Sequence, residues 1–119
     1  MNVLLVDDES ELVTTLAERL ELRGIHARWA INAEEAMRWL QEENFDIAVL
    51  DMKLPKMDGL ELKRRLQNLR PGLKFIFVTG HGSNSAYETA SSEVGSGYYL
   101  AKPLDIESLI GKMQEVLGR

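Results

Sequence analysis

An unbroken run of four apolar residues, Ile47-Ala48-Val49-Leu50, ends at the carboxylate of Asp51. A run without polar alternation is typical of a central parallel strand that is buried on both faces. Asp51 therefore lies at the carboxyl end of a predicted strand, ahead of a loop marked by Pro55 and the turn pair Asp58-Gly59. Ligands bind at this edge of an open α/β sheet, so Asp51 is a candidate for chemistry. The alternative interpretation is an Asp that only caps the next turn.

Three further apolar segments also end in polar residues that can take part in chemistry. With the residues that follow them, these segments are Val3–Val6 with Asp7-Asp8, Phe75–Val78 with Thr79-Gly80, and Tyr98–Ala101 with Lys102-Pro103. If all these strands are parallel neighbours, their carboxyl ends meet at one edge of the sheet. That edge is then expected to carry three carboxylates, one hydroxyl and one ammonium.

This set of side chains predicts a metal-assisted phosphoryl transfer. Crowded carboxylates repel one another, and a hard divalent cation relieves the repulsion at neutral pH. Mg²⁺ suits such a site because it takes oxygen ligands, often one or two carboxylates, and fills its shell with water and phosphate oxygens. A Lys and a Thr beside the cation supply the hydrogen-bond donors that a phosphoryl group needs.

The motifs at the predicted strand ends resemble those of the receiver domains of two-component response regulators. They are Val6–Glu9, Leu50–Gly59, Val78–Gly80 and Tyr99–Pro103, in the order and spacing of that family. The resemblance extends from about Asn2 to Leu117, nearly the whole chain. It implies that Asp51 accepts a phosphoryl group, that Thr79 and Lys102 contact this group, and that Tyr99 and Thr79 form the switch, with Tyr99 turning inward.

The resemblance also implies a metal site and two residues that tune the reaction. Mg²⁺, or Mn²⁺ in its place, is expected to bind Asp7, Asp8 and Asp51 together with the backbone carbonyl of Lys53. Asp8 is expected to be the direct ligand and Asp7 the more peripheral one. Lys53 and His81 flank the site, and we expect them to tune how fast water removes the phosphoryl group.

Partners are likewise implied by the resemblance. The phosphoryl donor is expected to be a sensor histidine kinase or a phosphotransfer protein, and the output a covalently linked or separate domain. The expected output surface is formed by the fourth helix, the fifth strand and the fifth helix, and a homodimer through this surface is a further expected partner. The predicted fourth helix, residues 83–94, has a thin apolar face. This indicates either a weakly docked switch element or sequence drift on a tolerant surface.

Composition narrows the function classes. With 119 residues the chain is expected to form a single domain over residues 1–119, and its net charge of −5 argues against direct binding of nucleic acid. The absence of Cys excludes a disulfide framework and a Cys-based zinc site. No apolar run approaches the roughly 20 residues that span a bilayer, so no membrane partner is expected and the cytoplasm is the expected location.

Helical patterns alternate with the predicted strands, which predicts an α/β fold with a five-stranded parallel sheet. This is a doubly wound, flavodoxin-like (βα)5 arrangement with right-handed crossovers. The expected strand order, 2-1-3-4-5, is taken from the resemblance. The second strand is predicted at an edge because Ile25, Ala27 and Trp29 alternate with the wetter His26 and Arg28.

Apolar spacing predicts which face of each later helix is buried. The third helix is expected to bury Leu62, Leu66 and Leu69, and Pro71-Gly72 is expected to end it. The last helix is expected to begin after Asp105 as its N-cap. Its expected buried residues are Leu109, Ile110, Met113 and Leu117. His26 is interpreted as a surface residue and Trp39 as a packing residue.

Two functions other than that of a phosphorylated receiver are compatible with an Asp at a strand end. One is a Mg²⁺-dependent phosphatase with an Asp nucleophile, but such enzymes carry a second Asp two residues later, where this chain has Lys53, and 119 residues leave no room for a cap. The other is a receiver-like binding module that is not phosphorylated. A chain without the chemistry would have no physical reason to keep a cluster of like charges.

Overall fold

The computed structural model describes residues 1–54, 56–80 and 99–118 of the chain. In sequence order, the elements are β1 (Asn2–Val6), α1 (Ser10–Leu22), β2 (His26–Ala30), α2 (Ala33–Glu42), β3 (Ile47–Asp51), β4 (Lys53–Leu54), β5 (Met57–Asp58), α3 (Gly59–Leu69), β6 (Lys74–Thr79), β7 (Tyr99–Ala101) and α5 (Ile106–Val116). The predicted fourth helix and His81 lie outside the described residues.

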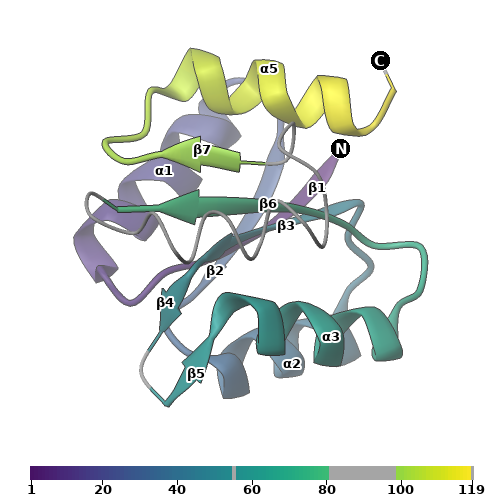
Figure 1. Cartoon of the computed structure of the whole chain (residues 1–119). Coiled ribbons are helices and arrows are strands. Elements are labelled where there is room, and N and C mark those ends of the chain that lie inside the picture. The colour runs from purple at the N-terminus through teal and green to yellow at the C-terminus, as the bar shows by residue number, and fades with distance from the viewer. Residues whose placement is uncertain (55, 81–98, 119) are drawn as a thin grey trace.

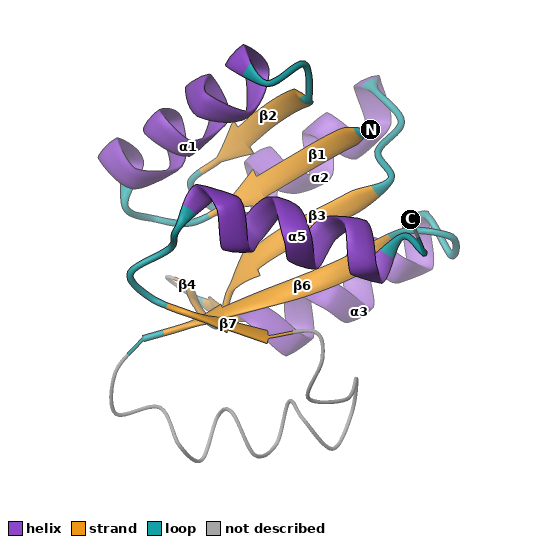
Figure 2. Cartoon of the chain, turned by 90° about the horizontal axis from the view of Figure 1, so that it is seen from above, coloured by secondary structure: helices purple, strands orange, loops and turns teal. Residues whose placement is uncertain are grey.

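The main sheet has five strands in the order β2-β1-β3-β6-β7, and every neighbouring pair is parallel. Counted without β4 and β5, which form a separate two-stranded antiparallel hairpin, this is the predicted order 2-1-3-4-5. Helices α1 and α5 cover one face of the sheet, and α2 and α3 cover the other (Figures 1 and 2). The predicted α/β doubly wound fold is confirmed.

Strand β3 lies at the centre of the sheet, and all five of its residues are buried. Successive side chains of a strand point to opposite faces, so one strand can supply both layers of the core. Ile47 and Val49 pack with α1 and α5, whereas Ala48 and Leu50 pack with α2 and α3. This double burial explains why the strand carries an unbroken apolar run, and it fixes Asp51 at the rim.

The last helix, α5, begins at the predicted N-cap, and its buried face is predicted in part. Asp105 accepts a hydrogen bond from the backbone N–H of Ser108, which confirms it as the N-cap of α5. Within α5, Leu109 and Met113 are buried as predicted. Ile110 and Leu117, which were also predicted to be buried, are only half-buried. Ile110 packs at the margin of the core, and Leu117 follows the last residue of α5.

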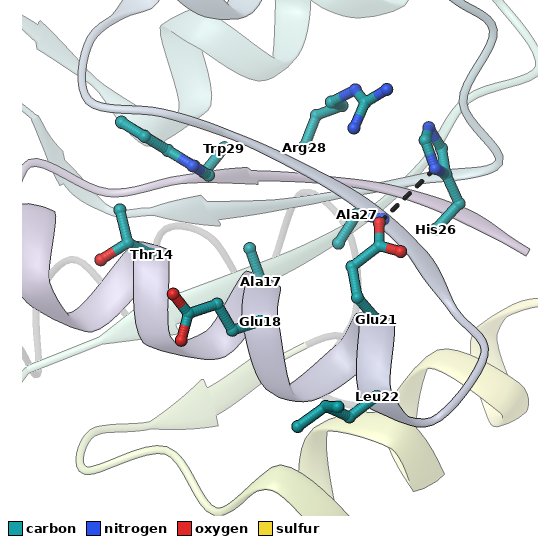
Figure 3. Close-up of a pocket in the computed structure, with 9 residues that line it drawn as sticks. All are labelled: Thr14, Ala17, Glu18, Glu21, Leu22, His26, Ala27, Arg28 and Trp29. Carbon is teal, nitrogen blue, oxygen red and sulfur yellow. Dashed lines mark hydrogen bonds and ion pairs between the residues drawn. The ribbon is translucent and has the colours of Figure 1, made fainter.

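The predicted burial of Leu69 is wrong, and Trp29 is exposed although it lies on the more apolar side of the alternation in β2. Leu69 is 42% exposed, because α3 ends there and Leu73, after the turn, occupies the buried position instead. Trp29 is 40% exposed. It lines an open groove between α1 and β2 together with Thr14 and Ala17, and this groove leaves part of the indole in contact with solvent (Figure 3).

Side chains from both neighbouring helices occupy backbone groups of the edge strand β2. Oε1 of Glu21 in α1 accepts a hydrogen bond of 2.8 Å from the backbone N–H of Ala27. The indole Nε1 of Trp39 in α2 donates a hydrogen bond of 2.9 Å to the backbone carbonyl of Trp29. Exposed edge strands can pair with other chains, and occupied backbone groups hinder this pairing.

A cluster of charged side chains lies along β2. Nε2 of His26 lies 2.9 Å from Oε1 of Glu43, and Nε of Arg28 donates to Oε2 of the same carboxylate at 2.8 Å. Nδ1 of His26 lies 3.5 Å from Oε1 of Glu21. Arg28 also stacks over the ring of Trp39, whose packing role is thereby confirmed. His26 is half-buried and contacts the carboxylates of Glu21 and Glu43, rather than being isolated at the surface.

Candidate functional site

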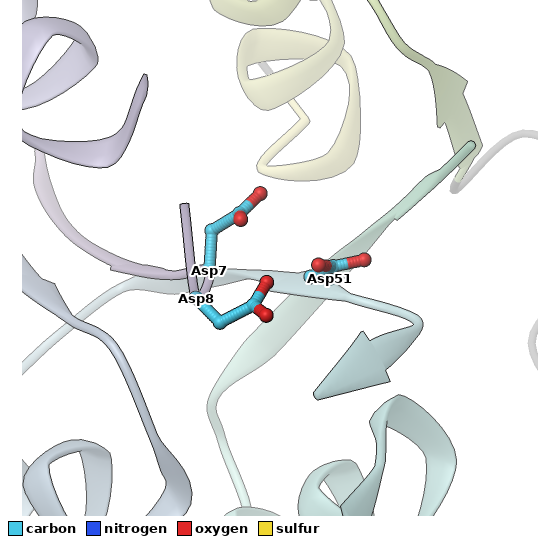
Figure 4. A group of neighbouring side chains, drawn as sticks. All are labelled: Asp7, Asp8 and Asp51. Atoms are coloured by element: carbon cyan, nitrogen blue, oxygen red, sulfur yellow. The ribbon is translucent and has the colours of Figure 1, made fainter. Parts of the chain in front are cut away.

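Three carboxylates gather at the carboxyl ends of β1 and β3. Asp7 and Asp8 follow β1, Asp51 ends β3, and one oxygen from each lies within 4.8 Å of the other two (Figure 4). Asp7 and Asp51 are each 6% exposed, and Asp8 is exposed. The sequence therefore predicts correctly that these residues meet at one edge of the sheet.

The ammonium of Lys102 reaches this cluster from the loop after β7. Its Nζ lies 3.1 Å from Oδ2 of Asp7 and 3.5 Å from Oδ2 of Asp51. It also lies 2.6 Å from Oε1 of Glu9. The backbone N–H of Lys102 donates to the carbonyl of Thr79 at 2.8 Å, which ties the loop to the end of β6. The four predicted residues Asp7, Asp8, Asp51 and Lys102 thus form one group.

Burial dominates the electrostatics of this group. Removal from water raises the pKa of Asp7 and of Asp51 above the usual value, although hydrogen bonds from the N–H of Glu9 and of Lys53 act in the opposite direction. Burial by itself lowers the pKa of the Lys102 ammonium. Hydrogen bonds to Glu9 and Asp7 outweigh this effect and raise that pKa, so the ammonium stays charged. The Lys102 ammonium therefore faces two buried carboxylates, Asp7 and Asp51, that are costly to keep ionised.

The loop after Asp51 is held close to the strand end. The N–H of Lys53 donates to Oδ1 of Asp51 at 3.1 Å, and the N–H of Gly59 donates to the carbonyl of Met52 at 2.9 Å. A Cβ at Gly59 would lie 2.8 Å from the backbone carbonyl oxygen of Asp51, closer than real contacts allow. The first turn of α3 can therefore pack against the end of β3 because residue 59 has no side chain.

Thr79 and Tyr99 lie on the adjacent strands β6 and β7. Thr79 is 7% exposed at the end of β6, and its carbonyl holds Lys102. The ring of Tyr99 stacks on Phe77 at 5.5 Å between centroids and is 7% exposed. Tyr99 is thus already packed inward here, which is the position that was expected only after phosphorylation. The roles of both residues as switch elements stay predictions.

Sequence reasoning missed one member of the site. Glu9 directly follows Asp7-Asp8 in the first motif, and its carboxylate contacts Lys102, a contact that the sequence pattern does not predict. The signal was the run of three consecutive acids. The backbone carbonyl of Lys53 as a metal ligand stays a prediction, and His81 lies outside the described residues.

Comparison with known proteins places these features in a family. The family model of the response regulator receiver domain matches residues 3–114. The chain is 32% identical to the response regulator receiver protein CpdR of Brucella abortus (strain 2308) over 115 residues, 97% of this chain and 95% of CpdR. It is also 32% identical over 116 residues to the transcriptional regulatory protein GlrR of Escherichia coli (strain K12), covering 98% of this chain but 26% of GlrR.

A solved structure of a response regulator from Burkholderia pseudomallei has the same fold, with a TM-score of 0.83 and 33% identity over 98% of this chain and 68% of that chain. That protein was crystallised with a phosphorylated aspartic acid, a calcium ion and citrate. No helix within residues 1–54, 56–80 and 99–118 has the length and apolarity to cross a bilayer. The chain belongs to the response regulator receiver domain family of two-component systems, whose members are signalling domains rather than catalytic enzymes.

Proposed function

We propose that this receiver domain accepts a phosphoryl group on Asp51 and that the charged group at the strand ends promotes the transfer. The observation that carries the proposal is the burial of Asp51 at the end of β3, with Asp7 and Asp8 beside it and the Lys102 ammonium 3.5 Å away. A buried carboxylate that shares its surroundings with other carboxylates is a costly arrangement, and such arrangements are typical of functional sites.

The acidic cluster fits a hard divalent cation, Mg²⁺ or Mn²⁺. Its donors are carboxylate oxygens within 4.8 Å of one another, and one of the three side chains, that of Asp8, is exposed and open to entry. Asp8 and Asp51 would hold the cation, Asp7 would lie behind them, and the carbonyl of Lys53 would add a ligand. When bound, the cation neutralises carboxylate charge and the charge of the transferred phosphoryl oxygens.

Three side chains would carry out the transfer itself: Asp51 as nucleophile, and Lys102 and Thr79 as donors to the phosphoryl oxygens. One carboxylate oxygen of Asp51 attacks the phosphorus, and the bond from phosphorus to the donor breaks as the new bond forms. The leaving group departs with the electron pair of that bond and takes a proton from water. Lys102, which stays protonated, pairs with a phosphoryl oxygen, and the hydroxyl of Thr79 donates to another. Lys53 and His81 would then tune hydrolysis.

The family membership supports the choice of partners. A sensor histidine kinase or a phosphotransfer protein would supply the phosphoryl group in the cytoplasm. The relative GlrR is a transcriptional regulatory protein of which the chain matches about a quarter, so the output would be a linked or separate domain. That output would read the face formed by the predicted fourth helix, β7 and α5, and homodimerisation through this face would be a second readout.

Intact-mass measurement with a small phosphodonor and Mg²⁺ tests the proposal. The wild-type chain should gain one phosphoryl group, and Asp51→Asn and the metal-free sample should gain none. Asp46→Asn, which changes the residue just before the same strand, is the matched control and should behave like wild type. Equal uptake by Asp51→Asn would refute the acceptor, no uptake by wild type would support an unphosphorylated module, and turnover of phosphate esters would support a phosphatase.

A further inference from the structure

Glu9 is the carboxylate that lies nearest to the Lys102 ammonium among those whose contacts are described. The distances from Nζ are 2.6 Å to Glu9, 3.1 Å to Asp7 and 3.5 Å to Asp51. The side chain of Glu9 is 59% exposed and that of Asp51 is 7% exposed. The ammonium therefore lies toward the mouth of the site, and the proposed acceptor is the most distant of the three carboxylates.

The position of Glu9 in α1 points to the same role. Glu9 is the N-cap residue of α1, yet its side chain makes no capping hydrogen bond. The side chains at the N-caps of α2, α3 and α5 each accept a backbone N–H; they are Asn32, Asp58 and Asp105. Glu is not among the residues favoured at N-caps. The carboxylate of Glu9 thus serves Lys102 and not the helix that it begins.

We infer that Glu9 is a positioning residue that holds the Lys102 ammonium away from Asp51 until a phosphoryl group is on the acceptor. The inference rests on the proposed function. As the bond between Asp51 and phosphorus forms and the bond to the donor breaks, Lys102 keeps its proton. It exchanges its ion pair with Glu9 for an ion pair with a phosphoryl oxygen, and the Glu9 carboxylate is left in contact with water.

The proposed role has two consequences for the resting protein. While Glu9 holds the ammonium, the charge of Lys102 is shared among three carboxylates, and Asp51 and Asp7 are more available to a divalent cation than they would be without Glu9. Without the charge of Glu9, Lys102 is expected to move toward these two carboxylates and compete with the cation. Because the Glu9 carboxylate is more than half exposed, its ion pair is partly screened, and we expect an effect of about two- to fivefold on cation affinity.

The Lys102 ammonium itself provides the first test, through its side-chain nitrogen resonance in the isotope-labelled full chain. The variants are Glu9→Gln and the matched control Glu11→Gln, which removes the same charge from an exposed acid in the first turn of the same helix. Glu9→Gln should shift the Lys102 signal and speed exchange of its protons, and Glu11→Gln should not. Beryllofluoride, a phosphoryl mimic, should make the Glu9→Gln and wild-type signals alike.

The second test measures Mg²⁺ affinity by calorimetry in a double-mutant cycle. Glu9→Gln should weaken binding about two- to fivefold in the wild-type background. In the Lys102→Met background it should weaken binding no more than Glu11→Gln does, because the competing ammonium is gone. If Lys102→Met does not fold, the resonance comparison decides by itself.

Three outcomes would overturn the inference. They are equal effects of Glu9→Gln and Glu11→Gln on the Lys102 signal, a Glu9→Gln shift that persists with beryllofluoride, and additive effects in the cycle. The first and third outcomes do not depend on phosphate uptake, and the second is read only where beryllofluoride changes the wild-type Lys102 signal. A wild-type chain that takes up no phosphate would instead refute the proposed function, so the two failures are distinguishable.

Discussion

The charged group at the strand ends and the charged cluster along β2 differ in how their charges are balanced. At the strand ends, the described ion pairs join one ammonium, Lys102, to three carboxylates, two of which are buried. Along β2, His26 and Arg28 share the carboxylate of Glu43, whose pKa is held below its usual value by hydrogen bonds from these two side chains. In the first group one ammonium faces more carboxylates than it can pair with, and in the second Arg28 and Glu43 form a matched pair whose side chains are 37% and 27% exposed.

This contrast separates charges that stabilise the fold from charges that are kept at a cost. Exposed, matched pairs contribute about 0–1 kcal/mol each and are screened by salt. Buried carboxylates that lack enough neighbouring cations lower the free energy of unfolding. Such residues are useful to a protein when they bind a cation or another positively charged ligand. The following variants test this difference, from the largest expected effect to the smallest.

Removal of the ammonium at the strand ends should have the largest effect. We expect Lys102→Met to lower the free energy of unfolding by about 2–4 kcal/mol in metal-free buffer, because it leaves buried carboxylates without their cation. The matched change in the other cluster, Arg28→Met, should cost less than about 1 kcal/mol. Urea denaturation of both variants, with and without Mg²⁺, measures the difference. Similar losses in the two variants would contradict the contrast.

A methyl group at the close approach between α3 and β3 should have the next largest effect. Gly59→Ala should cost about 1–3 kcal/mol, because the new Cβ meets the backbone carbonyl of Asp51 at 2.8 Å and the strand end has to shift. Gly72→Ala is the control, since a Cβ there meets no atom within 4 Å. Thermal unfolding compares the two variants. An unchanged midpoint for Gly59→Ala would show that the strand end is more adaptable than the geometry indicates.

Neutralising the buried Asp51 should stabilise the protein. Asp51→Asn keeps an oxygen for the N–H of Lys53 and removes a charge whose burial raises its pKa, so we expect a gain of about 0.5–2 kcal/mol in metal-free buffer. Saturating Mg²⁺ should reverse the order, because wild type binds the cation more tightly. Denaturant titrations in EDTA and in Mg²⁺ decide this. A loss of stability in EDTA would mean that Asp51 is not under electrostatic stress.

The smallest effect should come from Glu43→Gln. The pKa of Glu43 is lower in the folded chain than in the unfolded one, so its contribution is present above the unfolded value and is lost as the pH falls through the folded value. Glu43→Gln should therefore cost about 0.5 kcal/mol near neutral pH and nothing at pH values below the folded pKa of Glu43. Denaturation across this pH range measures it, with the exposed Glu42→Gln as control. A penalty that does not depend on pH would indicate lost packing instead of lost charge.

The sequence predicted best those features that depend on local pattern. The apolar run before Asp51 indicated a doubly buried strand, and the meeting of Asp7, Asp8, Asp51 and Lys102 followed from parallel strands that end in polar residues. Both predictions follow from the pattern of apolar residues in a strand and from the rule that the carboxyl ends of parallel strands lie at one edge of the sheet. Neither needed side-chain positions.

The features that sequence reasoning missed depend on contacts between distant residues. His26 and Glu43 are 17 residues apart, and Glu9 and Lys102 are 93 residues apart, so neither pair is visible in a local window. Leu69 fits the apolar spacing of α3 but lies at its last turn, where the helix has passed the face it covers. Apolar spacing indicates which residues would be buried if the helix continued along the sheet. The position at which the helix ends decides whether the last of them is covered.

The occupied edge of β2 has a consequence for how the chain would aggregate. The groups that block the edge belong to Glu21 in α1 and Trp39 in α2, so the edge stays closed only while both helices are docked. Partial opening of either helix would uncover backbone groups that can template the addition of another chain. The species that begins association is then a partly opened monomer and not the native one. At equal protein concentration, samples in which the opened state is more populated should accordingly aggregate faster.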